Sequence, residues 1–301
     1  MKLGLNTAIL GHLNFEEALQ TAQKIGYECL EVACWPQGKA ERRYAGVSHI
    51  DVDNLDVNYI HELLKKYEIE ISALAYYPNT MDPDLQARQV AIEHLKKVID
   101  AAHALDVNMV GTFVGRDPKK TVSENFELFK EIWPPIIQYA QEKGVKVAIE
   151  NCPMWFTDDE WPGGKNLMTT PANWRRAFEI IDSDYFGINY DPSHFVWQMI
   201  DYIKPIYEFK DKIFHVHFKD MKVYQDRLNE VGTMANPLEY IEPKIPGLGD
   251  VDWAQYVSAL NDVGYKGYAC VEVEDRTFEE NEERIFASCA LSYRYLRQFI
   301  Q

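Results

Sequence analysis

The chain alternates short runs of apolar residues with longer stretches in which apolar residues recur at helical spacing. Many of the short runs are apolar at nearly every position, which is typical of parallel strands covered on both faces. The pattern predicts strands at residues 2–9, 27–35, 70–77, 108–115, 146–152, 186–191, 213–220 and 268–275. Each strand is followed by a predicted helix, at residues 14–25, 57–67, 84–105, 123–143, 171–181, 196–209, 253–263 and 278–299.

Eight strand–helix units predict an α/β protein that closes into one (β/α)8 TIM barrel, with residues 1–301 forming a single domain. An open doubly wound sheet is the alternative. It would normally carry a glycine-rich phosphate loop after the first strand, but only Gly11 follows Leu10 here. The closed barrel therefore fits the pattern better.

Three connections are longer than the others, at residues 36–56, 153–170 and 221–252. All three follow strands, so in a barrel they would rise from the C-terminal rim, where active sites are built. Long loops inside compact domains are commonly lids or binding loops, although packing insertions and oligomer contacts explain them equally well. The second loop contains Trp155, Phe156 and Trp161, and Trp155 is our candidate for a substrate contact.

The amino-acid composition limits the kinds of molecule that the chain is expected to bind. The formal net charge of −16 and the sequence pI near 4.9 disfavour binding to nucleic acid or to anionic lipid. The first residues, MKLGLNTAIL, resemble a strand rather than a signal peptide, and no stretch approaches the length of a membrane span. The five cysteines lack zinc-finger spacing and are expected to be reduced. We therefore expect a cytoplasmic protein with a small-molecule partner.

Acidic and histidine side chains end four of the later strands: Glu150, Asp191, His217 and Glu272. Strand residues alternate between two faces, and on the last two strands the polar residues fall on one face and the apolar residues on the other. A barrel brings these strand ends to one rim. Three carboxylates and one imidazole suit a divalent ion of intermediate hardness, with Mn2+ as the first candidate and Co2+, Zn2+ or Mg2+ as alternatives. Each residue taken singly could instead be a hydrogen-bonded structural group.

Two more polar residues lie beside this set. His194 follows Asp191 by three positions, and it could be a metal ligand, a substrate contact or a helix cap; we favour the contact with a substrate hydroxyl. Lys219 could stabilise an oxyanion of the substrate, or it could form an ion pair with Asp220 or another carboxylate.

At these residues the chain resembles the xylose isomerase-like TIM-barrel superfamily, and in particular its sugar phosphate isomerase/epimerase branch. The similarity extends over nearly the whole chain and is carried by AIEN, TTPANWRRAFEII, YDPSHFVWQ, IFHVHFKD, PGLGDVDW and GYKGYACVEVED. Ketose 3-epimerases, inosose dehydratases, hydroxypyruvate isomerases and abasic-site endonucleases share this scaffold. The resemblance does not specify the substrate.

The resemblance implies that Glu150, Asp191, His217 and Glu272 are the metal ligands. It also implies that Glu150 and Glu272 are the acid/base pair, on opposite faces of the substrate carbon, and that His194 contacts a substrate oxygen. The epimerases have an arginine shortly after the histidine of the seventh strand. Here the corresponding stretch is MKVYQDR, so Arg227 is a shifted counterpart at best.

The expected reaction is proton abstraction next to a carbonyl through an enediolate, which would make the protein a metal-dependent sugar isomerase or epimerase. A lyase or dehydratase that eliminates a β-substituent from a 3-keto-sugar or 3-keto-glycoside would use the same site, with the loop around Trp155 holding an aglycone. Phosphodiester cleavage requires more histidines and a basic face, which this chain of 8 His lacks. A homo-oligomer is compatible with the sequence.

Overall fold

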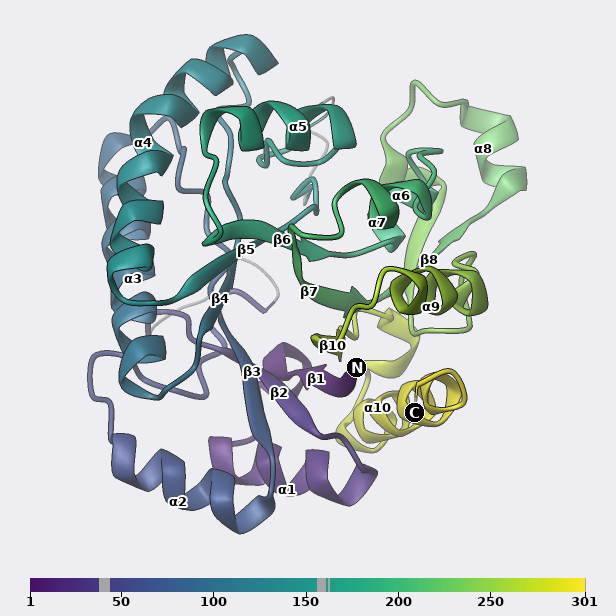
Figure 1. Ribbon diagram of the computed structural model, residues 1–301. Helices are drawn as coiled ribbons and strands as arrows, with labels where there is room; N and C mark the ends of the chain where they lie inside the picture. Colours follow the sequence, from purple (N-terminus) through teal and green to yellow (C-terminus); the bar gives the residue numbers. More distant parts are fainter. Residues whose placement is uncertain (38–43, 156–160, 162, 301) are drawn as a thin grey trace.

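A computed structural model describes residues 1–37, 44–155, 161 and 163–300. Eight parallel strands close into a barrel in the order β1-β10-β7-β6-β5-β4-β3-β2, with helices outside it (Figure 1). The predicted fold class is therefore confirmed. The barrel strands are β1 (Lys2–Asn6), β2 (Cys29–Ala33), β3 (Glu70–Ala75), β4 (Met109–Thr112), β5 (Lys146–Glu150), β6 (Phe186–Tyr190), β7 (Ile213–Phe218) and β10 (Tyr268–Val271).

The helices follow the strands along the chain and form the outer layer. They are α1 (Phe15–Ile25), α2 (Val57–Tyr67), α3 (Leu85–Ala104), α4 (Val122–Glu142), α5 (Pro171–Ile180), α6 (Ser193–Val196), α7 (Lys204–Glu208), α8 (Gln225–Val231), α9 (Trp253–Asp262) and α10 (Glu282–Arg297). Short 3-10 turns lie at Thr7–Leu10, Pro237–Glu239 and Arg276–Phe278. No helix among the described residues is long and apolar enough to cross a membrane.

Local sequence signals set the helix ends. Asn14 and Glu17 form a reciprocal capping box at the start of α1, and Thr121 and Glu124 form another at the start of α4. Gly26 ends α1 with a φ of 112°, a left-handed conformation that only glycine adopts without strain. These signals explain why most predicted helices agree with the structure to within a few residues.

The alternation along β7 orients His215 to Phe218 as predicted, whereas Phe214, at an irregularity in the pairing with β6, packs with Ala73, Met109 and Ala148 instead of the main core. Phe218 faces outward and packs edge-on against Trp253 of α9, with ring centroids 5.2 Å apart. His215 and His217 face the polar interior, where His215 Nδ1 donates to the Asn189 amide oxygen and Nε2 bonds the Ser72 hydroxyl. The main apolar core therefore lies between barrel and helices, and the polar positions are left inside the barrel near its C-terminal rim.

One predicted helix is wrong. Residues 196–209 form two short helices, α6 and α7, in place of one. Met199 has a φ of 57°, which interrupts helical geometry, and the Asp201 carboxylate accepts hydrogen bonds from the backbone N–H groups of Ile203 and Lys204. Pro205 then fits the first turn of α7, where its missing N–H costs nothing.

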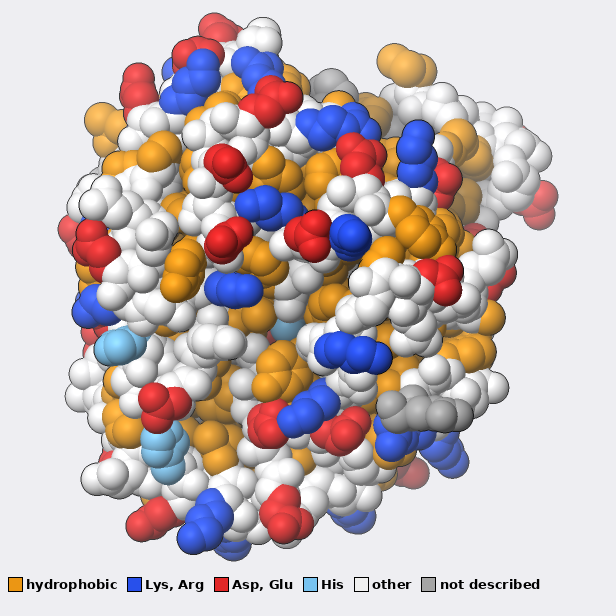
Figure 2. Space-filling view, in the orientation of Figure 1, with side chains coloured by type: hydrophobic (Ala, Val, Ile, Leu, Met, Phe, Trp, Pro, Cys, Tyr) orange, Lys and Arg blue, Asp and Glu red, His pale blue; other side chains and the backbone are white. Residues whose placement is uncertain are grey.

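The connection predicted at residues 221–252 has its own secondary structure. Strands β8 (Asp220–Val223) and β9 (Ile241–Lys244) form an antiparallel pair, and α8 lies between them along the chain. This arm projects from the barrel beside α9 (Figure 1). On the face shown in Figure 2, acidic and basic side chains are interspersed, and basic side chains do not gather into a broad patch.

Asp220 anchors the arm to the barrel. Its buried carboxylate accepts hydrogen bonds from the backbone N–H groups of Met221, Gly247 and Val251 and from the indole of Trp253, at 2.8–3.0 Å. Gly249 lies so close that an added Cβ would be 2.2 Å from Asp220 Oδ1. The predicted alternative of a Lys219–Asp220 ion pair is therefore wrong, because these backbone donors and the indole occupy the carboxylate.

Replacement of Asp220 by Ala should lower the free energy of unfolding by about 3 kcal/mol, because several buried donors would lose their acceptor. Denaturant titration measures this change. Asp211→Ala is the matched control, since Asp211 is exposed in the turn before β7, and it should change stability by less than about 0.5 kcal/mol. Equal stabilities of the two variants would contradict the anchoring role.

Candidate metal and acid–base site

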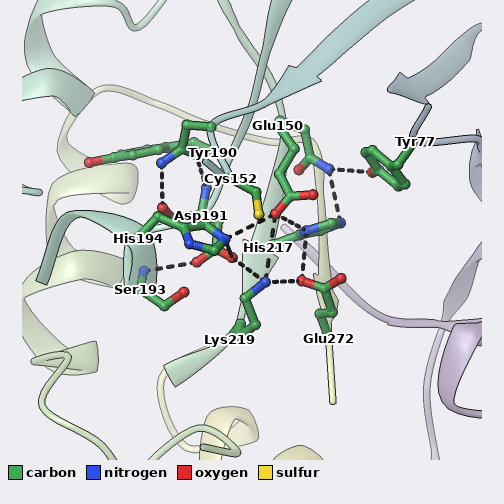
Figure 3. A network of polar contacts seen from close by, with 12 residues as sticks. Tyr77, Glu150, Cys152, Tyr190, Asp191, Ser193, His194, His217, Lys219 and Glu272 are labelled. Atoms are coloured by element: carbon green, nitrogen blue, oxygen red, sulfur yellow. Dashed lines mark hydrogen bonds and ion pairs between the residues drawn. The ribbon is translucent and has the colours of Figure 1, made fainter. Parts of the chain in front are cut away.

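The structure brings together the four side chains that the sequence singled out. Glu150 is the last residue of β5, Asp191 follows β6, His217 lies on β7, and Glu272 follows β10. One ligand atom from each lies within 4.8 Å of the others (Figure 3). Glu150, Asp191 and His217 are buried, and the Glu272 side chain is 15% exposed. Three carboxylates and an imidazole thus face one small volume at the rim.

Lys219 supplies a positive charge among these carboxylates. Its Nζ lies 2.6 Å from Glu272 Oε2, 3.1 Å from Asp191 Oδ2 and 3.6 Å from Glu150 Oε1 (Figure 3). A fourth carboxylate, that of Glu274, lies 3.3 Å away. Lys219 is only 1% exposed, so its ammonium depends on these acidic neighbours instead of water. Of the two roles foreseen for Lys219, the structure shows the ion pairs with neighbouring carboxylates.

Glu31 on β2 orients His217, and sequence reasoning missed it. Its Oε2 lies 2.5 Å from His217 Nε2, and its Oε1 accepts the Tyr77 hydroxyl. Because an ionised carboxylate can only accept, Nε2 carries the proton, and Nδ1 is the atom that faces the cluster. The available signal was a single glutamate inside the otherwise apolar strand CLEVA.

The backbone around Asp191 fixes its carboxylate. Asn151 receives the Asp191 N–H at 2.8 Å and donates to the Asp191 carbonyl at 2.9 Å, so the AIEN segment holds the start of the DPSH turn. Oδ1 accepts the backbone N–H of Ser193 at 2.8 Å. His194 Nε2 lies 3.3 Å from both Asp191 Oδ2 and Glu150 Oε1. His194 therefore borders the cluster, as expected for a residue that could contact a substrate.

The pKa values of Glu150 and Asp191 are lowered, whereas the pKa of Glu272 is raised. Burial opposes ionisation of Glu150, but the Lys219 ammonium and the nearby rings of His194 and His217 outweigh it and hold the pKa well below its usual value. Burial likewise opposes ionisation of Asp191, yet Lys219 and His194 lower its pKa to about 2. For Glu272, burial dominates over the attraction of Lys219 and raises the pKa.

His217 and Glu31 form an ion pair. Burial disfavours the imidazolium, but Glu31, Glu272 and Glu150 raise the pKa of His217 well above its usual value. Burial would raise the pKa of Glu31, whereas His217, His215 and Tyr77 bring it below its usual value. The two groups therefore stabilise each other's charged forms.

The residues present fit a divalent metal ion. Asp191 Oδ2 and His217 Nδ1 are buried atoms that have no hydrogen-bond partner in the described part of the chain. Both belong to the four-residue cluster, and with Glu150 and Glu272 they make a mixed oxygen and nitrogen donor set. A second group, Glu31, His215 and Cys270, also lies close together. There, however, both ring nitrogens of His215 are already engaged with Ser72 and Asn189.

A cavity opens onto the cluster. Glu150, Lys219 and Glu272 form its polar end, and Trp35 and Phe113 belong to its apolar wall. The small cavity and its acidic end suit a polar molecule that presents several oxygen atoms.

The structure does not bring Arg227 to the cluster. Its guanidinium bonds to Glu242 Oε1 at 2.8 Å and stacks on Tyr224, both of which belong to the projecting arm. The local ion pair holds it in the arm, and its role as a substrate ligand stays a prediction. Trp155 packs against Trp161 and Trp197 beside a second cavity. Phe156 lies outside the described residues.

Known proteins share this architecture. A family model described as xylose isomerase-like TIM barrel matches residues 19–295. The inosose dehydratase of Clostridium perfringens is 22% identical over 255 residues, which cover 78% of this chain and 80% of that protein. The solved structure of the IOLI protein with a binding zinc atom superimposes over 100% of both chains with a TM-score of 0.75 and 18% identity. D-psicose 3-epimerase from Clostridium cellulolyticum H10, solved with D-tagatose, also covers 100% of both chains, with a TM-score of 0.71 and 16% identity.

Replacement of Glu31 by Gln should weaken divalent-metal affinity by about 10- to 100-fold, because His217 would lose the charged acceptor that fixes its tautomer. Competition with a chelating indicator measures the affinity. Glu70→Gln is the matched control, because Glu70 pairs with Lys2 at the opposite end of the barrel and should leave the affinity unchanged. Unaltered affinity in both variants would show that Glu31 does not support the ligand.

Metal binding near neutral pH should release a proton. The raised pKa of His217 means that the metal-free imidazole is protonated, whereas a ligand must be neutral. Affinity should therefore increase as pH rises and decrease as pH falls. Calorimetric titration with Mn2+ in two buffers of different ionisation enthalpy counts the released protons. Identical heats in both buffers would contradict the prediction.

Proposed function

Because the chain belongs to the xylose isomerase-like TIM-barrel family, we propose that it is a metal-dependent enzyme that moves a proton next to a carbonyl of a sugar-like molecule, as an isomerase or epimerase. One observation carries this proposal: Glu150, Asp191, His217 and Glu272 converge on one small volume, and Glu150 and Glu272 line the adjoining cavity. The buried Asp191 Oδ2 and His217 Nδ1, which lack hydrogen-bond partners among the described residues, support metal binding there. Mn2+ is the proposed ion, with Co2+, Zn2+ and Mg2+ as alternatives.

A divalent ion at this site would supply Lewis-acid charge close to the carbonyl oxygen of the substrate. Glu150 and Glu272 act as the acid/base pair. One removes the carbon-bound proton, and the other returns a proton to the opposite face of the same carbon or, for isomerisation, to the neighbouring carbon. The opposite pKa shifts of the two residues suit such a division of labour.

Two further residues assist. The Lys219 ammonium is held within reach of Glu272 and Asp191 and stabilises negative charge that develops on a substrate oxygen. His194 is positioned to hydrogen-bond a substrate hydroxyl, since its Nε2 already faces Glu150 and Asp191.

Elimination of a β-substituent is the second candidate reaction. The epimerases that the sequence resembles have an arginine near the seventh strand, and the only nearby counterpart here, Arg227, is paired with Glu242 in the arm. In addition, the inosose dehydratase of Clostridium perfringens matches 78% of the chain. A lyase would use the same residues, with one carboxyl group protonating the departing group instead of the carbon.

Incubation of the Mn2+-loaded protein with ketoses, inososes and 3-keto-glycosides in heavy water tests the proposal. Deuterium should appear at the carbon next to the carbonyl. Unchanged substrate mass apart from the label identifies isomerisation or epimerisation, whereas an enone and a released group identify elimination. Absence of label and of product with every substrate class would refute the proposed function.

Glu150→Gln and Glu272→Gln should each lower kcat by about 10²- to 10⁴-fold and weaken metal binding, because each removes both a general acid or base and a ligand. Deuterium exchange and metal content measure the two effects. Glu16→Gln is the control, since Glu16 pairs with Lys66 on the outer helices. Near-normal turnover in both site variants would contradict the assignment.

A further inference from the structure

A second cavity lies beside the first. Its volume is about 530 Å³, and three indoles and a phenol line it: Trp155, Trp161, Trp197 and Tyr240. This volume falls in the range of small-molecule sites. Arg116 is the one charged residue among its described lining residues, in contrast with the acidic end of the first cavity.

The cavity contains polar groups that have no partner. Trp155 Nε1 and Arg116 Nε are buried and have no hydrogen-bond partner within the described residues. Tyr240, which also lines the cavity, is only 4% exposed. These two donors belong to residues of the cavity wall, and Asn173, Gln198 and Thr233 add further polar side chains to the lining, so the wall offers hydrogen-bonding groups beside its indoles.

The indole rings meet edge-on or at an angle and do not stack face to face. Trp155 lies edge-on to Trp161, with ring centroids 5.0 Å apart, and tilts by 48° against Trp197 at 4.7 Å. Aromatic faces with adjacent hydrogen-bond donors recognise flat rings that carry hydroxyl groups.

The two cavities share a wall. Asn166 lines the second cavity and donates hydrogen bonds to the carbonyls of Glu150 and Cys152, and Cys152 lines the first cavity. Gln198, also in the second cavity, donates to the carbonyl of His194. The two cavities are therefore adjacent, as the binding of a molecule with two linked rings requires.

We infer that this cavity binds a second hydroxylated ring, joined by a glycosidic bond to the ring that reacts. The inference rests on the proposed function and deepens it: the substrate is a glycoside and not a free monosaccharide. The second ring is either another sugar or a hydroxylated aromatic ring, since both present a flat face and oxygen acceptors.

Calorimetric titration with three probes tests this inference. Methyl β-D-glucopyranoside has one ring, and 4-hydroxyphenyl β-D-glucopyranoside and cellobiose add an aromatic ring or a second sugar to the same first ring; the α-linked counterparts complete the panel. At least one two-ring probe should bind about tenfold more tightly than its one-ring partner. The preferred probe identifies the kind of second ring.

Tyr240→Phe removes only the hydroxyl. It should lower the affinity for the two-ring probe by about fivefold, while the affinity for the one-ring probe and the metal content stay unchanged. Trp197→Leu should have the larger effect. Tyr59→Phe is the matched control, since Tyr59 is 48% exposed on α2.

Equal affinities for one-ring and two-ring probes, or a two-ring advantage that survives both Tyr240→Phe and Trp197→Leu, would overturn the inference. Binding is measured without turnover, so the two proposals fail separately. A two-ring preference without deuterium exchange would refute the reaction alone. Exchange with no two-ring preference would refute the subsite alone.

Discussion

The structure depends on the balance of charge at the C-terminal rim of the barrel. Glu150, Asp191 and Glu272 bring three carboxylates into one largely buried volume, where like charges repel strongly because water is excluded. A cation must be present for all three to be ionised. Lys219 provides one positive charge at 2.6–3.6 Å, and the buried Asp191 Oδ2 and His217 Nδ1 make no hydrogen bond within the described residues. The rim therefore presents a candidate cation site built from four strand ends.

Support for this arrangement comes from deeper in the barrel. Glu31 fixes the ring of His217 from β2, and Asn151 clamps the backbone of Asp191 from the end of β5. Asn151 and Asp191 follow the adjacent strands β5 and β6, whereas Glu31 reaches His217 from β2, which is separated from β7 by β1 and β10 in the closed sheet. Such surroundings hold ligands in place and limit the reorganisation that binding requires.

The loops that follow the strands form the parts of the rim that differ between barrels of one fold. The arm between β7 and α9 carries Arg227 and Tyr240, and Asp220 fastens it through backbone hydrogen bonds and the indole of Trp253. Together with the segment around Trp155, the arm forms the aromatic cavity beside the carboxylates. A common barrel with a distinct rim explains how proteins of one fold act on different substrates.

The sequence by itself determined the closed barrel, since eight apolar runs alternate with amphipathic helices, and strand parity with strand-end position identified the four residues that converge. It did not reveal Glu31, the break of the helix predicted at 196–209, or the place of Arg227. Those features depend on contacts that the pattern of single elements does not record: β2, which is not adjacent to β7, supplies the carboxylate, the Asp201 side chain restarts the helix, and Glu242 holds the arginine. Periodicity records which face of an element is buried, whereas only the folded chain decides which side chains meet there.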